Sequence, residues 1–215
     1  MYTLREWQQL RKDKNDLIIN ASTISGLDLL QPFPIGMCYQ YLEYEETETQ
    51  IGHHEHLVWC GFNEHTDRIR RPWPLIYNRK KIAATLQSNG ILNKMKTHRE
   101  YYSELPNHKF VVSPEGNGID CHRHYEALIA GCIPIVEYNP RIVHLYHGCP
   151  ILYTQTYKEI TSAFLEQKYL EMIDTKYDFS KLFISSYSPE LQAQIKSNGN
   201  FWTNRMLKKI KWDIK

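Results

Sequence analysis

KFVVSPEGNGIDCHRHYEALIAGCIPIV, residues 109–136, is the stretch that decides the fold. Its first five residues form a short apolar run suited to a buried strand, and 114–118 interrupt that run with proline and two glycines. Asp120 is then placed to cap a helix over 121–130, which ends before a second buried strand over 132–136. Two short strands joined by a helix predict a parallel strand–helix–strand unit.

The alternation of strands and helices continues on both sides of this unit. Apolar runs predict further strands at 16–20, 56–62 and 150–153. Helical patterns and capping residues predict helices at 4–14, 77–88, 97–105, 140–147, 156–168, 177–185 and 201–210. Two of these helices begin with the pattern of a capping box, Thr97 with Glu100 and Thr156 with Glu159. The chain is therefore expected to be an α/β protein with a Rossmann-like parallel sheet and helices on both faces.

The loop at 114–118 is a candidate site for an anion. In an open parallel sheet such a loop lies at the carboxyl end of a strand, where loop amides and the following helix N-terminus attract phosphate. Arg123 and Glu126 are three residues apart and share one face of that helix, which suits a diphosphate and a ribose diol. The spacing matches neither G-x-G-x-x-G nor the P-loop, and similar junctions occur in α/β proteins without a ligand. The spacing alone leaves both interpretations open.

Four segments add a more specific signal: SPEGNGIDCHRHYEALIAGCIPIV at 113–136, PIG at 34–36, WCGFNEHTDRIRRP at 59–72 and LYHGCPILYTQTYKEIT at 145–161. Together they resemble the nucleotide-sugar half of GT-B glycosyltransferases, most closely the exostosin-type group. The resemblance covers about residues 33–185 and is most specific over 109–136. It implies a hexosyl- or pentosyltransferase that moves a sugar from a nucleotide-sugar donor to a hydroxyl of a carbohydrate or glycoconjugate acceptor.

The resemblance also implies roles for individual residues. Glu126 is expected to hold the ribose hydroxyls, and Arg68, Arg71 and Arg123 are expected near the diphosphate. The loop residues Gly116, Asn117 and Gly118 are expected near the phosphates or the sugar. Independently of the resemblance, Glu115 and Glu137 lie at the ends of predicted strands, where a carboxylate is placed to meet the transferred sugar or the acceptor. The pattern identifies no catalytic base.

The predicted domain organisation departs from the family. We expect an N-terminal remnant over 1–33, a nucleotide-sugar-binding domain over 34–190 and a C-terminal helix over 191–215. A GT-B enzyme has two Rossmann-like domains, and a domain needs ~100–150 residues, so the first domain is expected to be reduced or absent. The chain is therefore either a glycosyltransferase or a non-catalytic nucleotide-sugar-binding module. In the second case a partner chain would complete the acceptor side.

Composition limits the other classes of function. A formal net charge of +2 is too small to indicate nucleic-acid binding, although six basic residues within 68–81 leave an RNA-binding alternative. No apolar stretch reaches the ~20 residues that cross a bilayer, and the N-terminus lacks the apolar core of a secretory signal. Five cysteines, an odd number, favour reduced thiols over a disulfide framework. These features favour a cytoplasmic protein without a transmembrane segment.

No metal or other cofactor is expected. Histidines cluster at 53–56 and 122–124, but neither cluster matches a zinc motif. The chain also has no Asp-x-Asp triplet to hold Mg²⁺ against a diphosphate. The family resemblance implies metal-independent transfer, in which a helix dipole and basic side chains stabilise the leaving group.

Overall fold

The computed structural model describes residues 1–10, 12–23, 33–44, 54–72 and 77–213. Its centre is a four-stranded parallel sheet made of β1 (His56–Trp59), β2 (His108–Val112), β3 (Ile133–Glu137) and β4 (Leu152–Thr154). The strands lie in the order β1-β2-β3-β4, with Phe110 opposite Ile133 and Ile135 opposite Leu152. The predicted α/β class with a parallel, Rossmann-like sheet is confirmed.

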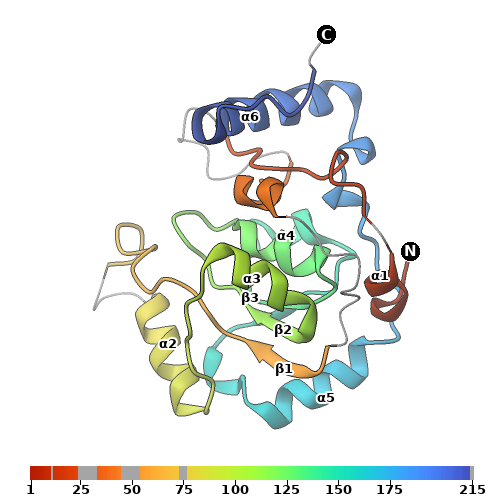
Figure 1. The fold of residues 1–215 in the computed structure, drawn as a ribbon. Coiled ribbons are helices and arrows are strands. Elements are labelled where there is room, and N and C mark those ends of the chain that lie inside the picture. The colour runs from red at the N-terminus through yellow and green to blue at the C-terminus, as the bar shows by residue number, and fades with distance from the viewer. Residues whose placement is uncertain (11, 24–32, 45–53, 73–76, 214–215) are drawn as a thin grey trace.

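Helices flank both faces of this sheet (Figure 1). Phe110 of β2 contacts Tyr169 of α5 (Ser162–Met172), with ring centroids 6.0 Å apart. Ser113, three residues further along, is hydrogen-bonded to His124 of α4 (His122–Ile129). Because successive residues of a strand point to opposite faces, α4 and α5 cover opposite sides of β2.

Two helices connect β1 to β2, and capping residues start both. Asn78 caps α2 (Arg79–Ser88) by accepting a hydrogen bond from the backbone N–H of Lys81. Thr97 and Glu100 form the predicted capping box of α3 (His98–Glu104). A short 3₁₀ helix, η2 (Leu105–Asn107), then leads into β2.

The two ends of the chain pack together against the α4 side of the sheet (Figure 1). The first helix, α1 (Leu4–Gln9), places Trp7 in the core, where its indole N–H donates to the carbonyl of Leu128. The long C-terminal helix, α6 (Pro189–Leu207), contacts η1 (Tyr39–Glu43), and Trp202 donates to the carbonyl of Ser22. Side chains from both ends and from the sheet form one hydrophobic core.

Several predicted elements differ from the structure. The strand expected over 16–20 is absent, and Leu17 and Ile19 form only isolated bridges with Phe183 and Met37. Thr156 and Glu159 do not start a long helix, because Glu159 accepts a hydrogen bond from Thr154. Thr156 is the N-cap and Glu159 the last residue of the 3₁₀ helix η4 (Tyr157–Glu159), and α5 begins later, at Ser162. The helices expected over 140–147 and 177–185 are the 3₁₀ turns η3 (Val143–Tyr146), η5 (Ser180–Leu182) and η6 (Ile184–Ser186).

Candidate functional site

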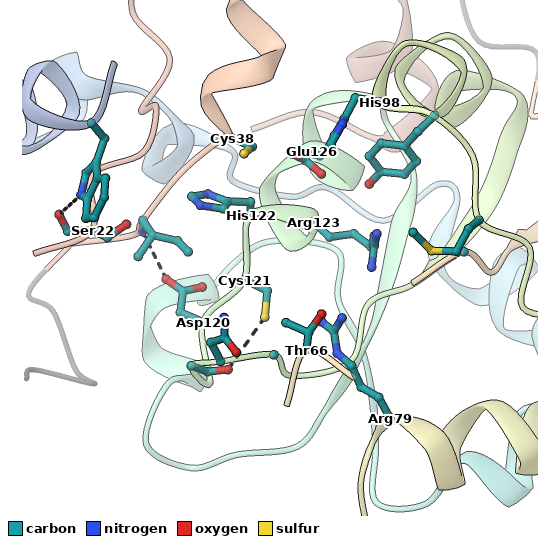
Figure 2. Close-up of a pocket in the computed structure, with 18 of the residues that line it drawn as sticks. Ser22, Cys38, Thr66, Arg79, His98, Asp120, Cys121, His122, Arg123 and Glu126 are labelled. Atoms are coloured by element: carbon teal, nitrogen blue, oxygen red, sulfur yellow. Dashed lines mark hydrogen bonds between the residues drawn. The ribbon is translucent and has the colours of Figure 1, made fainter. Parts of the chain in front are cut away.

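A cavity of about 840 Å³ lies beside the 116–118 loop and the start of α4. We call it the main cavity. Its walls come from the end of β1, from α3 and α4, and from the two ends of the chain through Ser22 and Trp202. Figure 2 shows side chains from these separate elements pointing into one space. Its size is within the range of roughly 300–1,000 Å³ that is usual for small-molecule sites.

The main cavity brings together five of the eight residues that the sequence predicts as a site: Gly116, Asn117, Gly118, Arg123 and Glu126. The two side chains on α4 lie on one face of the helix, as their spacing predicts. Both the loop after β2 and the helix that follows it therefore contribute to the same site.

Arg123 and Glu126 are both held by tyrosines of α3. The guanidinium of Arg123 lies over the ring of Tyr101, 5.4 Å from its centroid. The Nε atom of Arg123 is buried and has no hydrogen-bond partner among the described residues. Glu126 is 6 % exposed, and its Oε1 accepts a hydrogen bond of 3.0 Å from the hydroxyl of Tyr102. One Glu126 oxygen is thus fixed, while the side chain still lines the cavity.

Arg79, the first residue of α2, also lines the main cavity, although no sequence pattern distinguishes it from its basic neighbours. Its guanidinium donates to three backbone carbonyls: Glu115 at 2.8 Å, Pro114 at 2.8 Å and Asn63 at 3.2 Å. A guanidinium has five N–H groups, so these three hydrogen bonds leave N–H donors that can bind a ligand. Burial lowers the pKa of Arg79, and the nearby positive charge of Arg123 lowers it further.

Arg79 and Arg123 lack salt-bridge partners among the described residues, although Tyr101 and the charge of Glu126 raise the pKa of Arg123 against the effect of burial. Within the described residues, neither guanidinium forms an ion pair with a carboxylate, although each lines the same cavity. A Cβ added at Gly116 would lie 3.1 Å from Nη2 of Arg79, so the loop backbone passes close to this cation. A buried cation, Arg79, and a half-buried cation, Arg123, beside a loop with two glycines favour a bound anion.

The other three predicted residues, Arg68, Arg71 and Glu115, are not among the residues that line the main cavity. Arg68 is exposed on the preceding turn. Arg71 is buried, and its Nε lies 2.8 Å from Asp67 while its Nη1 lies 2.5 Å from Glu137. Burial lowers the pKa of Arg71, but the nearby carboxylates have the larger combined effect, so its pKa is raised overall.

Arg71 and Glu115 help to position the loop instead. Arg71 donates to the Glu115 carbonyl at 3.0 Å, and Glu137 accepts from the Glu115 N–H at 2.9 Å. The Glu115 carboxylate forms a 2.8 Å ion pair with Arg70, which also donates to the Gly116 carbonyl. The side chains of Arg70 and Arg71 therefore hold the backbone of the loop. Sequence alone does not reveal this role, because the loop and Glu137 are distant from these arginines along the chain.

Asp120 does not cap α4, contrary to the sequence expectation. The N-cap residue is Cys121, which makes no side-chain capping bond. Asp120 instead accepts hydrogen bonds from the hydroxyls of Tyr125 and Tyr146 and from the backbone N–H of Ile35. Burial raises the pKa of Asp120, and these donors oppose the shift. Its carboxylate lines the cavity but is already occupied by protein donors.

The histidines near this site have separate environments. His122 lines the main cavity and donates from Nδ1 to the Gly36 carbonyl at 2.8 Å, whereas His124 is fully buried. His53 lies outside the described residues. In the described part of the chain, no group of three histidine, cysteine, aspartate or glutamate side chains is arranged to hold a metal ion. All five cysteines are free thiols.

The geometry can bind an anion next to a polar group that accepts hydrogen bonds. Arg79 and Arg123 supply the cations, and Glu126 supplies the acceptor. None of the helices described here has the length and apolar character needed to cross a membrane. No protein-family model matches the chain, and a search of curated proteins finds no significant match.

Proposed function

We propose that the chain binds a nucleotide sugar in the main cavity and transfers its sugar to a hydroxyl acceptor. The observation that carries the proposal is the pair of guanidiniums, Arg79 and Arg123, that line one cavity and form no salt bridge among the described residues. A diphosphate carries two to three negative charges at oxygens that match guanidinium donors. The 116–118 loop lies beside these cations and leaves room for the ligand to approach the backbone.

The order of the side chains supports a nucleoside diphosphate over a free phosphate. Figure 2 shows Arg123 between Glu126 and Arg79 in this view. A ribose next to Glu126 would place its diphosphate at Arg123 and Arg79. The second oxygen of Glu126 would accept from the ribose hydroxyls, while Tyr102 fixes Oε1.

In the transfer step, the acceptor oxygen forms a bond to the anomeric carbon of the sugar. The bond from that carbon to the diphosphate oxygen breaks, and its electron pair leaves with the diphosphate. The hydroxyl proton passes to a base or to solvent. Arg79 and Arg123 would stabilise the negative charge that develops on the leaving oxygen, because fixed cations in a buried site need little reorganisation.

A binding experiment tests the donor site. Isothermal titration with inorganic pyrophosphate and with nucleoside diphosphates should detect binding, and Arg123→Met should weaken both kinds of ligand. Glu126→Gln should weaken nucleoside diphosphates and leave pyrophosphate unchanged, because only the ribose contacts this side chain. Glu166→Gln, an exposed substitution on α5, is the matched control. Absence of binding for every ligand, or unchanged affinity in Arg123→Met, would refute the proposed site.

One observation favours the alternative of a donor-binding module without catalytic activity. Among the described residues that line the cavity, the carboxylates are Asp120 and Glu126. Asp120 is occupied by hydroxyl and backbone donors, and Glu126 is assigned to the ribose, so neither is an available base. Turnover of nucleotide sugars by the purified chain distinguishes the two functions. Transfer or hydrolysis without a partner protein would exclude the non-catalytic module.

A further inference from the structure

A second cavity, of about 520 Å³, lies between η1 and the start of α3. We call it the aromatic cavity. It is lined by Gln40, Glu43, Tyr44, His98, Arg99 and Tyr102. Three of these six side chains carry aromatic rings, and the other three carry an amide, a carboxylate and a guanidinium. Such a combination of ring faces and polar edges suits a flat, hydrogen-bonding ligand.

The aromatic cavity adjoins the Glu126 end of the main cavity. His98 lines both cavities. The ring of Tyr102 lines the aromatic cavity, while its hydroxyl donates to Glu126 in the main cavity at 3.0 Å. Cys38 lines the main cavity and is hydrogen-bonded to Gln40, which lines the aromatic cavity. Two of these links are hydrogen bonds and the third is a shared side chain, so the cavities are neighbours.

We propose that the aromatic cavity binds the nucleobase of the nucleoside diphosphate. This inference rests on the proposed donor site, which places the ribose at Glu126. The base is attached to the ribose on the side away from the diphosphate. In Figure 2, Arg123 and Arg79 lie on one side of Glu126, and His98, which lines the aromatic cavity, lies on the other. The base therefore enters the space that adjoins Glu126 and is lined by Tyr44, His98 and Tyr102.

The chemistry of the walls agrees with a base. Tyr44 and Tyr102 lie against each other with ring centroids 5.6 Å apart and an angle of 45° between their planes. Aromatic rings stack on every base because each base has a π face. Glu43 offers acceptor oxygens for ring N–H or amino groups, and Arg99 offers donors for carbonyl oxygens or ring nitrogens. A phosphate is a poorer occupant, because the Glu43 carboxylate would repel it.

The test compares ligands with and without a base. Titration with UDP, GDP, ADP and CDP is set against inorganic pyrophosphate and ribose 5-phosphate. At least one nucleoside diphosphate should bind roughly tenfold more tightly than pyrophosphate, which is a modest stacking contribution. Tyr44→Leu and His98→Ala should remove most of this preference and leave pyrophosphate affinity unchanged. Tyr138→Leu, an exposed tyrosine that lines neither cavity, is the matched control.

The possible outcomes separate the two proposals. If pyrophosphate binds as tightly as every nucleoside diphosphate, the base site is refuted and the anion site stands. If neither kind of ligand binds, both proposals are refuted. Arg99→Ala replaces an exposed side chain, so it gives a further test if Tyr44→Leu does not fold, with exposed Arg141→Ala as its control. Base preference that survives His98→Ala and Arg99→Ala would place the base elsewhere.

Discussion

His124 makes the stability of the fold depend on pH in a way that a single substitution removes. The ring is fully buried, its Nδ1 is hydrogen-bonded to Ser113 at 2.7 Å, and it packs edge-on against Tyr146. Burial, reinforced by the charges of Arg79 and Arg123, lowers the pKa of His124 to about 3. The ordinary pKa of histidine, which applies to the unfolded chain, is about 6.5. The folded protein therefore keeps this ring neutral.

The sign and size of the effect follow from these two values. Between pH 3 and 6.5 the unfolded chain binds a proton at His124 and the folded chain does not, so acid favours unfolding. The free energy of unfolding falls by up to about 1.4 kcal/mol for each pH unit below 6.5. Lowering the pH from 7.5 to 5 thus removes about 2 kcal/mol of stability through this one ring.

Urea denaturation at pH 7.5 and pH 5 measures this contribution. His124→Asn removes the titrating ring and keeps an amide that can pair with Ser113. The variant should be less stable than the wild type at pH 7.5, because it leaves a cavity, but it should lose about 2 kcal/mol less between the two pH values. His147→Asn, at an exposed histidine, should keep the wild-type loss. An equal loss in His124→Asn and the wild type would refute the reasoning.

Three further substitutions test the packing and the capping. A Cβ at Gly199 would lie 2.4 Å from the ring of Trp212 and 2.7 Å from the carbonyl of Ile19. Gly199→Ala should therefore lower the free energy of unfolding by about 1–3 kcal/mol, which a lower urea midpoint would report. An unchanged midpoint would mean that α6 does not pack there as described. Burial lowers the pKa of Lys211 to about 7, so stability should rise with pH from 7 towards 10.5, and Lys211→Met should flatten that rise. Thr97→Ala removes the cap of α3 and should cost about 1 kcal/mol in the same assay. A loss below the error of the measurement would contradict the capping box.

The parts of the fold that were predicted correctly depend on local signals. The apolar runs and the glycine-bearing loop define β2, α4 and β3 almost to the residue, because strand, turn and helix preferences agree there. The same Thr-x-x-Glu pattern was right at Thr97 and wrong at Thr156. At Thr156 the glutamate three residues on bonds back to Thr154 at the end of β4, so a neighbouring strand decides the outcome.

Spacing along one helix was sufficient to predict that two of the candidate residues lie together. Arg123 and Glu126 share a face because they are three residues apart, and both line the main cavity. The choice among the arginines of 68–81 could not be made in this way. Arg71 and Arg79 belong to the same basic segment, but Asp67 and Glu137 bind the first, while the second reaches the loop carbonyls. Those partners are set by tertiary structure, so composition does not distinguish the two residues.

Four arginines around the 114–118 loop fall into two pairs with different roles. Arg70 and Arg71 each have a carboxylate partner and a loop carbonyl, so their charge is neutralised within the protein and their hydrogen bonds fix the loop. Arg79 and Arg123 line the cavity, and burial lowers the pKa of Arg79, with a further lowering from the like charge of Arg123. An anion bound between them would relieve that repulsion, whereas an anion at Arg70 or Arg71 would compete with an existing carboxylate. We therefore propose that an anionic ligand binds at Arg79 and Arg123 rather than at Arg70 or Arg71.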